Sequence, residues 1–324
     1  MAESNPPERI IKLAEKIQKE AKEQSTPVPK MRIPKMYDIE SGLGIGDIMV
    51  LLTLLPELKR AHPGWTIRLI TEKKDWASLG HDYVISKDDF EAAGTRGEKY
   101  FKQFEEDWIY YDLEAIGKKK LRHELFGERL GVNPEPAILR VTDDAMYWAK
   151  QIIDNKDNLK VVGIAPYSSS EQRTWPDENW VLLIEKLIAA GYFPLMIGGP
   201  GEGERSKFYP CMRYWGMGAQ RTTALLAQCA LVIGNDSGMA HVAGTLRRPT
   251  IVIGAPSDTP RIFGWYGSVR CLQAHSECGM CYWRRDRGFR QECNYRCRLI
   301  GTISPPDVFK EAKRILDAND GKRL

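Results

Sequence analysis

A short polar stretch between two apolar runs could hold an anionic ligand. Gly234-Asn-Asp-Ser-Gly238 follows the apolar run Ala230–Ile233, and a second run, Pro249–Pro256, comes soon after. Both runs are bounded by Gly or Pro, which predicts buried parallel strands. At the connection from a strand to a helix, the first backbone N–H groups of the helix are unpaired and lie at the positive end of the helix dipole. Phosphate groups bind at such positions. The alternative is an ordinary helix capped by Ser237 or Asp236.

A second glycine-rich turn lies near the start of the chain. Ser41-Gly-Leu-Gly-Ile-Gly-Asp47 stands between a predicted strand at Tyr37–Glu40 and a helix whose apolar face begins at Ile48. Trp65–Thr71 is the next predicted strand. Strand, turn, helix and strand predict a βαβ unit with a parallel sheet.

The second half of the chain also alternates strands with helices, and more regularly. Strands are predicted at Lys160–Pro166 and Phe193–Gly198. Helices are predicted at Asp143–Asp154, Asp177–Ala190, Thr222–Cys229 and Asp307–Ala318. Ligand sites in such sheets lie at the carboxyl ends of the strands. We therefore expect an α/β fold with two doubly wound domains facing across a cleft. The expected limits are 1–30 for an N-terminal helix and linker, 31–155 for the first domain and 156–324 for the second.

Composition bounds the class of protein. The chain has 324 residues, 43% hydrophobic and 28% charged, with a net charge of +4. These values suit a soluble two-domain protein, and the mild charge permits an anionic ligand without demanding nucleic acid. No apolar run approaches the roughly 20 residues of a membrane span, and Met1–Lys30 lacks the apolar core of a signal peptide. We expect a cytoplasmic protein, with a peripheral position at the inner membrane as the variant.

Several of these motifs together resemble glycosyltransferase family 9, the bacterial heptosyltransferase family with the GT-B fold. The resemblance covers about residues 37–72 and 160–312. The residues that carry it are Gly46-Asp47 with Pro56, Trp175-Pro176, Gly198-Gly-Pro-Gly-Glu202, Gly234-Asn-Asp-Ser-Gly-Met-Ala-His241, and Cys297 ahead of Ile303-Ser-Pro305. It implies two Rossmann-like domains, the first for the acceptor and the second for a nucleotide sugar.

The resemblance implies an inverting transfer of a sugar from a nucleotide-sugar donor, by family default ADP-heptose, to a hydroxyl, without a catalytic metal. Asp47 matches the catalytic base of the family; its alternative is a helix cap. Arg173 stands where the family commonly has Lys and would neutralise the diphosphate; its alternative is a solvated loop residue. The remaining donor-binding candidates are Gly44, Gly46, Ser168, Gly199, Glu202, Asp236, Ser237, Gly238 and His241.

These candidates have different expected contacts. The backbone N–H groups of Ser237 and Gly238 suit the diphosphate better than the carboxylate of Asp236, because like charges repel. Glu202 would accept hydrogen bonds from the ribose, or be a solvated loop residue. His241 would reach phosphate, or cap a buried polar network.

A cysteine cluster near the end of the chain predicts a small metal finger in the second domain, spanning 278–297. Cys278-Gly-Met-Cys281 and Cys293-Asn-Tyr-Arg-Cys297 form two pairs that could enclose one tetrahedral ion, zinc or iron. Free thiols or two disulfides are the alternatives. Cys211, Cys229 and Cys271 are expected to be core or incidental residues. Arginines and aromatic residues interleave within this segment, as Trp283-Arg-Arg285 illustrates.

That basic segment leaves the acceptor open among a glycan, a protein and a nucleic acid, because Arg and aromatic side chains together can contact any of them. Three readings of function follow. The first is a heptosyltransferase-like enzyme. The second is the same fold acting on protein or modified DNA with another nucleotide sugar. The third is a non-catalytic binding module of GT-B-like fold. An oligomer is compatible with all three.

Overall fold

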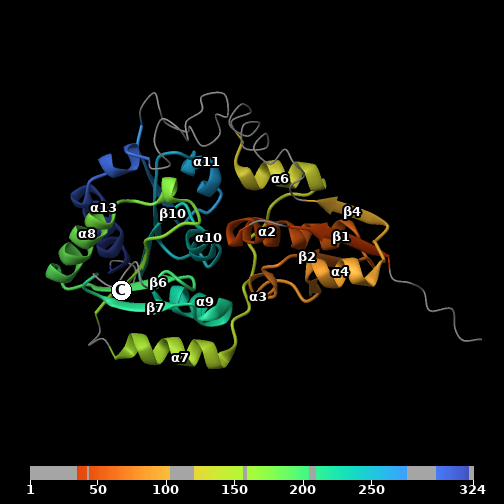
Figure 1. The fold of residues 1–324 in the computed structure, drawn as a ribbon, viewed down its shortest axis with the longest axis horizontal. Helices are drawn as coiled ribbons and strands as arrows, with labels where there is room; N and C mark the ends of the chain where they lie inside the picture. The colour runs from red at the N-terminus through yellow and green to blue at the C-terminus, as the bar shows by residue number, and fades with distance from the viewer. Residues whose placement is uncertain are drawn as a thin grey trace, which may run out of the picture. The chain divides into compact units, whose positions relative to one another are not determined.

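Parallel strands form two separate sheets in the structure, which is a computed structural model (Figure 1). It describes residues 35–41, 44–102, 120–155, 159–203, 209–275 and 297–320. Met36–Leu324 group as one compact unit. None of the helices in the described part of the chain has the length and apolar character needed to cross a lipid bilayer.

The first sheet is built around the predicted βαβ unit. Its strand order is β3-β2-β1-β4, and every pairing is parallel. The strands are β1 (Met36–Glu40), β2 (Thr66–Ile70), β3 (Val84–Ile85) and β4 (Lys99–Lys102). The helices of this part are α2 (Ile45–Ala61), α3 (Lys74–Ala77) and α4 (Lys87–Ala93). Helix α2 connects β1 to β2, as the glycine-rich turn and the apolar helix face predict.

Successive residues of β1 face opposite sides of this sheet, which gives the two sides different characters. Ile39 joins the apolar core formed with α2. Asp38 faces the other side, where its carboxylate accepts two hydrogen bonds of 2.8 Å from the guanidinium of Arg68 on β2. Phe90 of α4 covers this pair, with its ring 4.9 Å from the Arg68 guanidinium carbon. The two charges are both buried, and each is compensated by the other.

The second sheet has the order β10-β9-β8-β5-β6-β7 and is parallel throughout. Its strands are β5 (Val161–Ala165), β6 (Phe193–Gly198), β7 (Met212–Trp215), β8 (Leu231–Asn235), β9 (Thr250–Gly254) and β10 (Val269–Gln273). The chain runs outward from β5 to β7 and then returns to the other side of β5. Consequently β5 and β8 are neighbours at the point where the strand order reverses, which is the position where doubly wound sheets bind ligands.

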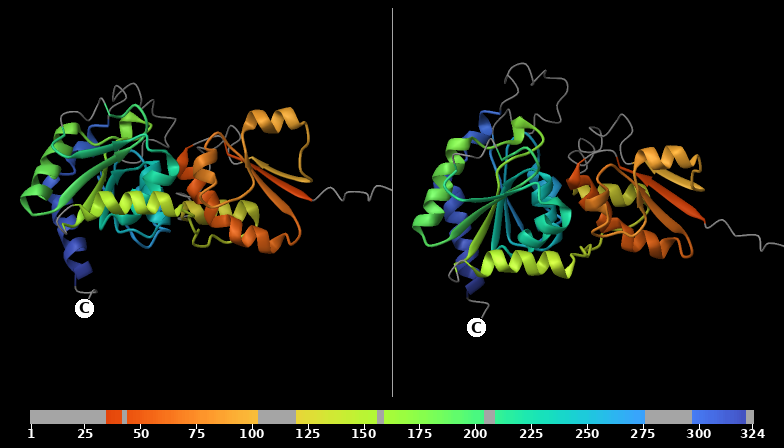
Figure 2. Two further views of the ribbon diagram at one scale, coloured as in Figure 1. Left: turned by 90° about the horizontal axis from the view of Figure 1, so that it is seen from below. Right: turned by 60° about the horizontal axis from the view of Figure 1, so that its bottom comes forward.

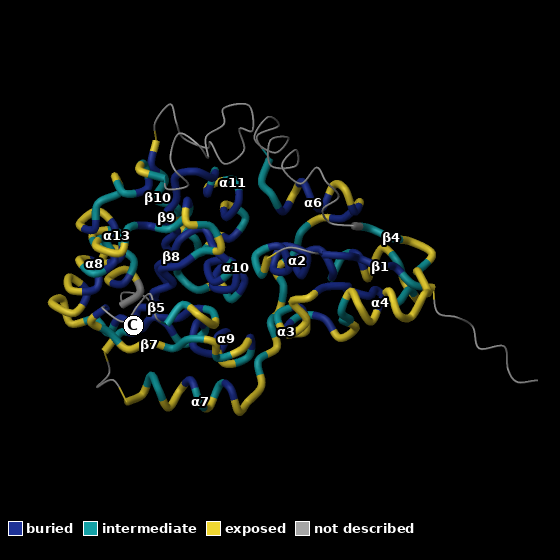
Figure 3. Tube along the Cα trace, in the orientation of Figure 1, coloured by how far each residue is buried: buried dark blue, intermediate teal, exposed yellow. Residues whose placement is uncertain are grey.

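Helices cover both faces of this second sheet (Figure 2). The helices α8 (Asp177–Ala189) and α13 (Pro305–Asp320) lie on one face, and α9 (Gly218–Gln228) and α10 (Gly238–Thr245) lie on the other. Strand β8 is buried at every residue, and α10 is buried from Met239 to Thr245 (Figure 3). The polar turn between them is therefore held in place from both sides.

Helix α7 (Asp143–Asp154) has the limits that the sequence predicts, and it packs beside α9. Trp148 of α7 meets Tyr214 of β7 edge to face at 5.9 Å. The predicted domain limit at 155–156 falls between α7 and β5 and remains a prediction. Helix α9 begins four residues before the predicted Thr222. The remaining short elements are α6 (Arg122–Leu130), η1 (Glu171–Arg173), α11 (Thr259–Phe263) and η4 (Leu299–Thr302).

Candidate functional site

The carboxyl ends of β5 and β8 bring two of the predicted segments together. Asn235, the last residue of β8, is completely buried. Its side chain donates to the carbonyl of Pro166 and accepts from the backbone N–H of Trp175 at 3.1 Å. One amide group thereby fastens the loop that follows β5 to the end of β8. Trp175 is fully buried and acts as a packing residue, and its indole donates to the carbonyl of Ile303 at 3.0 Å.

Asp236 connects the same two loops through charge. Its Oδ2 lies 3.3 Å from the NH1 of Arg173 and accepts a 2.7 Å hydrogen bond from the Oγ of Ser257. Its backbone carbonyl accepts a 3.1 Å hydrogen bond from the Oγ of Ser168. Arg173 also donates to the Oγ of Ser169 at 3.0 Å. Sequence reasoning found Asp236, Ser168 and Arg173 but missed Ser257.

The side-chain cap predicted for α10 is not formed. Ser237 occupies the N-cap position, but its side chain makes no capping hydrogen bond, and the carboxylate of Asp236 is engaged elsewhere. The Oγ of Ser237 is buried and has no hydrogen-bond partner in the described part of the chain. Leaving a buried hydroxyl unpaired costs free energy. An orphan hydroxyl at a helix N-terminus is the kind of group that a phosphate oxygen would satisfy.

The N-termini of α2 and α10 meet at two glycines. A Cβ atom at Gly46 would lie 2.6 Å from the Cδ2 of His241, and a Cβ at Gly238 would lie 2.7 Å from the Cβ of Ile45. Neither distance is compatible with a larger side chain in this packing. Gly46 and Gly238 therefore allow α2 and α10 to pack closely against each other. This role is separate from the ligand approach expected of the glycine-rich motifs.

Asp47 lies in the first turn of α2 with a side chain that is only 11% exposed. Its Oδ2 accepts a 3.0 Å hydrogen bond from the backbone N–H of Gly44, so Asp47 contributes to capping α2 as its third residue, while Gly44 and not Asp47 occupies the N-cap position. Its Oδ1 lies 3.0 Å from the NH2 of Arg122 on α6. A carboxylate oxygen has two lone pairs, so both contacts leave acceptor capacity for a proton. The base and cap readings are thus compatible at this residue.

Arg122 is a second residue that sequence reasoning missed. It lies in the stretch between about 74 and 129 where the sequence shows no readable motif, and only folding brings α6 against α2. No local pattern could have found it, because its partner Asp47 is 75 residues away in the chain.

His241 sits in a buried aromatic environment. Its Nδ1 lies 3.1 Å from the hydroxyl of Tyr266, and its ring centroid is 4.3 Å from that of Phe263. Burial, followed by the nearby charges of Arg122 and Arg173, holds the pKa of His241 well below the ordinary value of a histidine. Burial also raises the pKa of Tyr266. The imidazole is consequently neutral at physiological pH and can donate or accept a hydrogen bond without changing the net charge of the site.

His123 adds a second neutral imidazole. It is completely buried, stacks on Trp265 at 4.7 Å and meets Tyr266 edge to face at 4.7 Å. Burial is the main cause that lowers its pKa well below the ordinary value, and His241 contributes next. Within the described residues, neither ring nitrogen has a hydrogen-bond partner.

The glycine-rich loop after β6 is placed at the next strand end. The backbone N–H of Gly199 donates a 2.8 Å hydrogen bond to the Oε2 of Glu202. A Cβ at Gly203 in this loop would lie 3.1 Å from the Cδ1 of Trp215, so the loop packs closely against the end of β7. The ribose contact predicted for Glu202 remains a prediction.

The predicted metal finger lies largely outside the described residues, because Cys278, Cys281 and Cys293 fall there. Cys297 is described, is partly buried and packs against the core of the second sheet. In the described ranges, no group of three or more His, Cys, Asp and Glu side chains could hold a metal ion. Cys229 is completely buried, and burial raises the pKa of its thiol to about 12, which fits the predicted core role.

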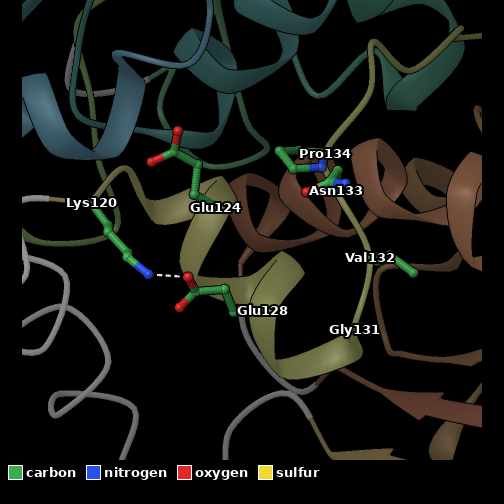
Figure 4. Close-up of a pocket in the computed structure, with 7 residues that line it drawn as sticks. All are labelled: Lys120, Glu124, Glu128, Gly131, Val132, Asn133 and Pro134. Carbon is green, nitrogen blue, oxygen red and sulfur yellow. Dashed lines mark hydrogen bonds and ion pairs between the residues drawn. The ribbon is translucent and has the colours of Figure 1, made fainter.

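A cavity of about 430 Å³ opens beside α6 (Figure 4). Its lining residues are Lys120, Glu124, Glu128, Gly131, Val132, Asn133 and Pro134. Lys120 forms an ion pair with Glu128, and Glu124 accepts a 2.9 Å hydrogen bond from the backbone N–H of Leu121. None of the sequence-predicted site residues lines this cavity. We place the candidate site at the strand ends and helix N-termini because the predicted residues gather there.

The fold defines an α/β protein with two parallel sheets that resembles the GT-B heptosyltransferases. The sequence profile of glycosyltransferase family 9 (heptosyltransferase) matches residues 121–288, more than half of the chain. The chain belongs to this family. The matched range begins beside Arg122 and includes Asp236, Ser257 and His241.

Individual relatives agree with this assignment. Lipopolysaccharide heptosyltransferase 1 of Escherichia coli is 31% identical over 106 residues, which are 31% of this chain and 33% of the relative. The match therefore spans about a third of that relative's length. The solved ADP-heptose lipopolysaccharide heptosyltransferase II of E. coli has a TM-score of 0.66 at 16% identity, covering 88% of this chain and 99% of the other. The iron-containing dodecameric glycosyltransferase TibC of enterotoxigenic E. coli has a TM-score of 0.61 at 16% identity, with coverages of 88% and 77%.

Proposed function

We propose that this protein is an inverting glycosyltransferase that moves a sugar from a nucleotide-sugar donor of the ADP-heptose type to a hydroxyl of an acceptor. The observation that carries the proposal is the position of Asp47. Its carboxylate lies in the first turn of α2, and that helix meets the N-terminus of α10 through Gly46 and His241. The candidate base therefore lies close to the candidate phosphate site, which is the N-terminus of α10 at Ser237 and Gly238.

Asp47 is the proposed general base. It takes the proton of the acceptor hydroxyl while the hydroxyl oxygen attacks the anomeric carbon of the donor sugar. The bond from that carbon to the diphosphate breaks, and its electrons leave with the nucleoside diphosphate. Attack from the opposite face inverts the anomeric configuration. The Gly44 N–H and the Arg122 guanidinium would hold the carboxylate in place during this step.

The departing diphosphate needs donors that stabilise its charge. The backbone N–H groups of Ser237 and Gly238, the orphan hydroxyl of Ser237 and the guanidinium of Arg173 are the proposed donors. Ser168 and His241 lie beside them, and Gly199 with Glu202 would hold the ribose. Burial of this surface would limit competing hydrolysis by water.

The donor class rests on the relatives. One solved structure of TibC is a complex with ADP-D-beta-D-heptose, and its TM-score to this chain is 0.60. We propose a glycan acceptor in the cytoplasm, with protein and nucleic acid as outcomes that an acceptor screen would separate. The dodecameric state of TibC supports a test for self-association here.

We also propose that Cys278, Cys281, Cys293 and Cys297 hold one structural metal ion. Four thiolates suit zinc or iron in a tetrahedral site. The one described ligand, Cys297, packs against the core next to η4, which would couple metal binding to the stability of that region. Iron in TibC makes iron the first ion to test.

The test is a screen of purified protein against ADP-heptose, ADP-glucose, UDP-glucose, UDP-N-acetylglucosamine and GDP-mannose by thermal shift, followed by measurement of nucleoside diphosphate release. We expect a selective shift with ADP-heptose. Asp47→Asn should keep that shift and lose roughly 100- to 10,000-fold in turnover. Equal loss of donor binding in Asp47→Asn would make Asp47 structural. If none of the donors produced a thermal shift, the interpretation as a non-catalytic binding module would be favoured.

A further inference from the structure

Ser257 lies in the loop after β9 and is completely buried. Its Oγ donates a 2.7 Å hydrogen bond to the Oδ2 of Asp236, the same oxygen that lies 3.3 Å from the NH1 of Arg173. We propose that Ser257 is a positioning residue for donor binding. It fixes the carboxylate of Asp236, and Asp236 in turn holds the guanidinium of Arg173 ready for a diphosphate. The proposal rests on the donor role that the proposed function gives to Arg173.

The backbone that carries Ser257 lies in a hydrogen-bonded turn. Its backbone carbonyl accepts a 3.0 Å hydrogen bond from the N–H of Thr259, in the turn that begins α11. The next residue, Asp258, caps that helix by accepting from the N–H of Arg261 at 3.3 Å. A hydrogen-bond donor on such a turn, shielded from water, restricts the orientation of a carboxylate more than a solvated donor does.

Asp236 needs this support because its carboxylate could otherwise rotate. Rotation toward a bound diphosphate would bring two negative charges together. With Ser257 donating to Oδ2, that oxygen stays turned toward the β9 loop, and the carboxylate side chain is only 5% exposed. The negative charge of Asp236 is thus directed at Arg173 instead of at the ligand.

Restricting the side chain of Arg173 lowers the entropy that it loses when it binds phosphate. An arginine side chain has many rotamers and loses entropy when it is fixed. Asp236 restricts it at NH1, and Ser169 restricts it at NH2. A guanidinium that is already in place loses less entropy when it binds phosphate, which is the usual advantage of preorganisation. Ser257 therefore contributes to donor affinity without touching the donor.

A double-mutant cycle tests this chain of contacts. The dissociation constants of ADP and UDP would be measured by calorimetry for the full chain, for Ser257→Ala, for Arg173→Ala and for the double variant. With the nucleotide that binds more tightly, we expect Ser257→Ala to weaken binding about tenfold, the value of a hydrogen bond to a charged group. In the Arg173→Ala background, the same substitution should change binding less than about twofold.

Thr250→Val is the matched control. Thr250 begins β9, the strand that leads to Ser257, and its buried hydroxyl donates to the carbonyl of Arg248 at 2.9 Å. It should lower the melting temperature about as much as Ser257→Ala does and leave nucleotide affinity unchanged. Loss of affinity in Thr250→Val equal to that in Ser257→Ala would make the effect one of general stability and overturn the inference.

The remaining outcomes separate the inference from the proposed function. Equal weakening by Ser257→Ala in both backgrounds would show that Ser257 acts independently of Arg173, and the inference alone would fail. An unchanged affinity in Arg173→Ala would remove the donor role of Arg173 and the inference with it, while the Asp47 test would still stand. If neither nucleotide bound the wild-type chain, both the donor site and the inference would fail.

Discussion

The α-carbon of Gly46 packs directly against the imidazole of His241: a Cβ at this position would lie 2.6 Å from Cδ2 and 3.0 Å from Nε2 of that ring. Gly46 is the second residue of α2 in the first half of the chain, and His241 lies on α10 in the second half. The contact joins the two glycine-rich motifs that the sequence presents nearly 200 residues apart. It also places the neutral imidazole of His241 next to the helix turn that carries Asp47.

This contact predicts different outcomes for two neighbouring glycines. Gly46→Ala should destabilise the protein by about 1–3 kcal/mol, because the added methyl group overlaps the His241 ring. Gly44→Ala should cost less than about 1 kcal/mol, since among the described residues its Cβ would meet only the Oδ2 of Asp47, at 3.6 Å, and its φ of −92° suits alanine. Urea denaturation of both variants makes the comparison. Equal stability of the two variants would mean that the α2–α10 contact is looser than described.

The ion pair between Arg122 and Asp47 predicts a stability cost that a second substitution should reverse. Arg122→Met keeps the length of the side chain but leaves the Asp47 carboxylate, 11% exposed, without this cation. We expect a loss of about 2–3 kcal/mol, toward the lower end of the cost of breaking a buried pair. The double variant Arg122→Met/Asp47→Asn should recover much of that loss, because the unpaired charge is gone. Denaturation midpoints of the three variants give the coupling, and additive effects would contradict it.

The buried His123 predicts a dependence of stability on pH. Its pKa is lowered in the folded state, so the unfolded chain takes up a proton as the pH falls through about 6.5 while the folded chain stays neutral. Its contribution to stability is therefore complete above about pH 6.5 and is lost as the pH falls below that value, by about 1.4 kcal/mol per pH unit. His241 adds to this dependence in the same direction.

His123→Phe separates this contribution. The phenyl ring keeps the stacking on Trp265 and removes two ring nitrogens that have no partner in the described residues. At pH 7.5 we expect a gain of about 1 kcal/mol in the free energy of unfolding. Between pH 6.5 and 5.5 the stability of the variant should fall less steeply than that of the wild type. A slope unchanged from the wild type would show that His123 does not titrate as its burial indicates.

The proposed metal site predicts that one cysteine substitution removes the ion. Cys281→Ser should lose the zinc or iron measured by elemental analysis, and its melting temperature should fall because a structural metal contributes folding free energy directly. A chelator should lower the melting temperature of the wild type and leave that of Cys281→Ser unchanged.

Cys211→Ser is the control for this prediction. Cys211 lies just before β7, outside the predicted finger, and burial raises the pKa of its thiol to about 11. Its substitution should leave the metal content unchanged. Metal retained in Cys281→Ser, or absent from the wild type, would refute the four-cysteine site.

Local patterns predicted much of the fold. Apolar runs bounded by Gly or Pro identified β5, β6, β8 and β9, because strands buried on both faces read as continuous apolar sequence. The limits of β6 and α7 agree with the structure residue by residue. The edge strands β7 and β10 escaped prediction, since their partly exposed residues interrupt the apolar pattern. The short strand β4 lies in the stretch that has no readable motif.

The sequence by itself determined the family, the two glycine-rich turns and the identity of Asp47, Arg173, Asp236 and His241 as site candidates, because these depend on residue type and local spacing. Only the tertiary structure decided what each of them contacts. Arg122 meets Asp47, Ser257 meets Asp236 and Tyr266 meets His241 through helices and loops that are distant in the chain. Long-range packing brings such partners together, and the spacing of residues along the chain carries no record of that packing.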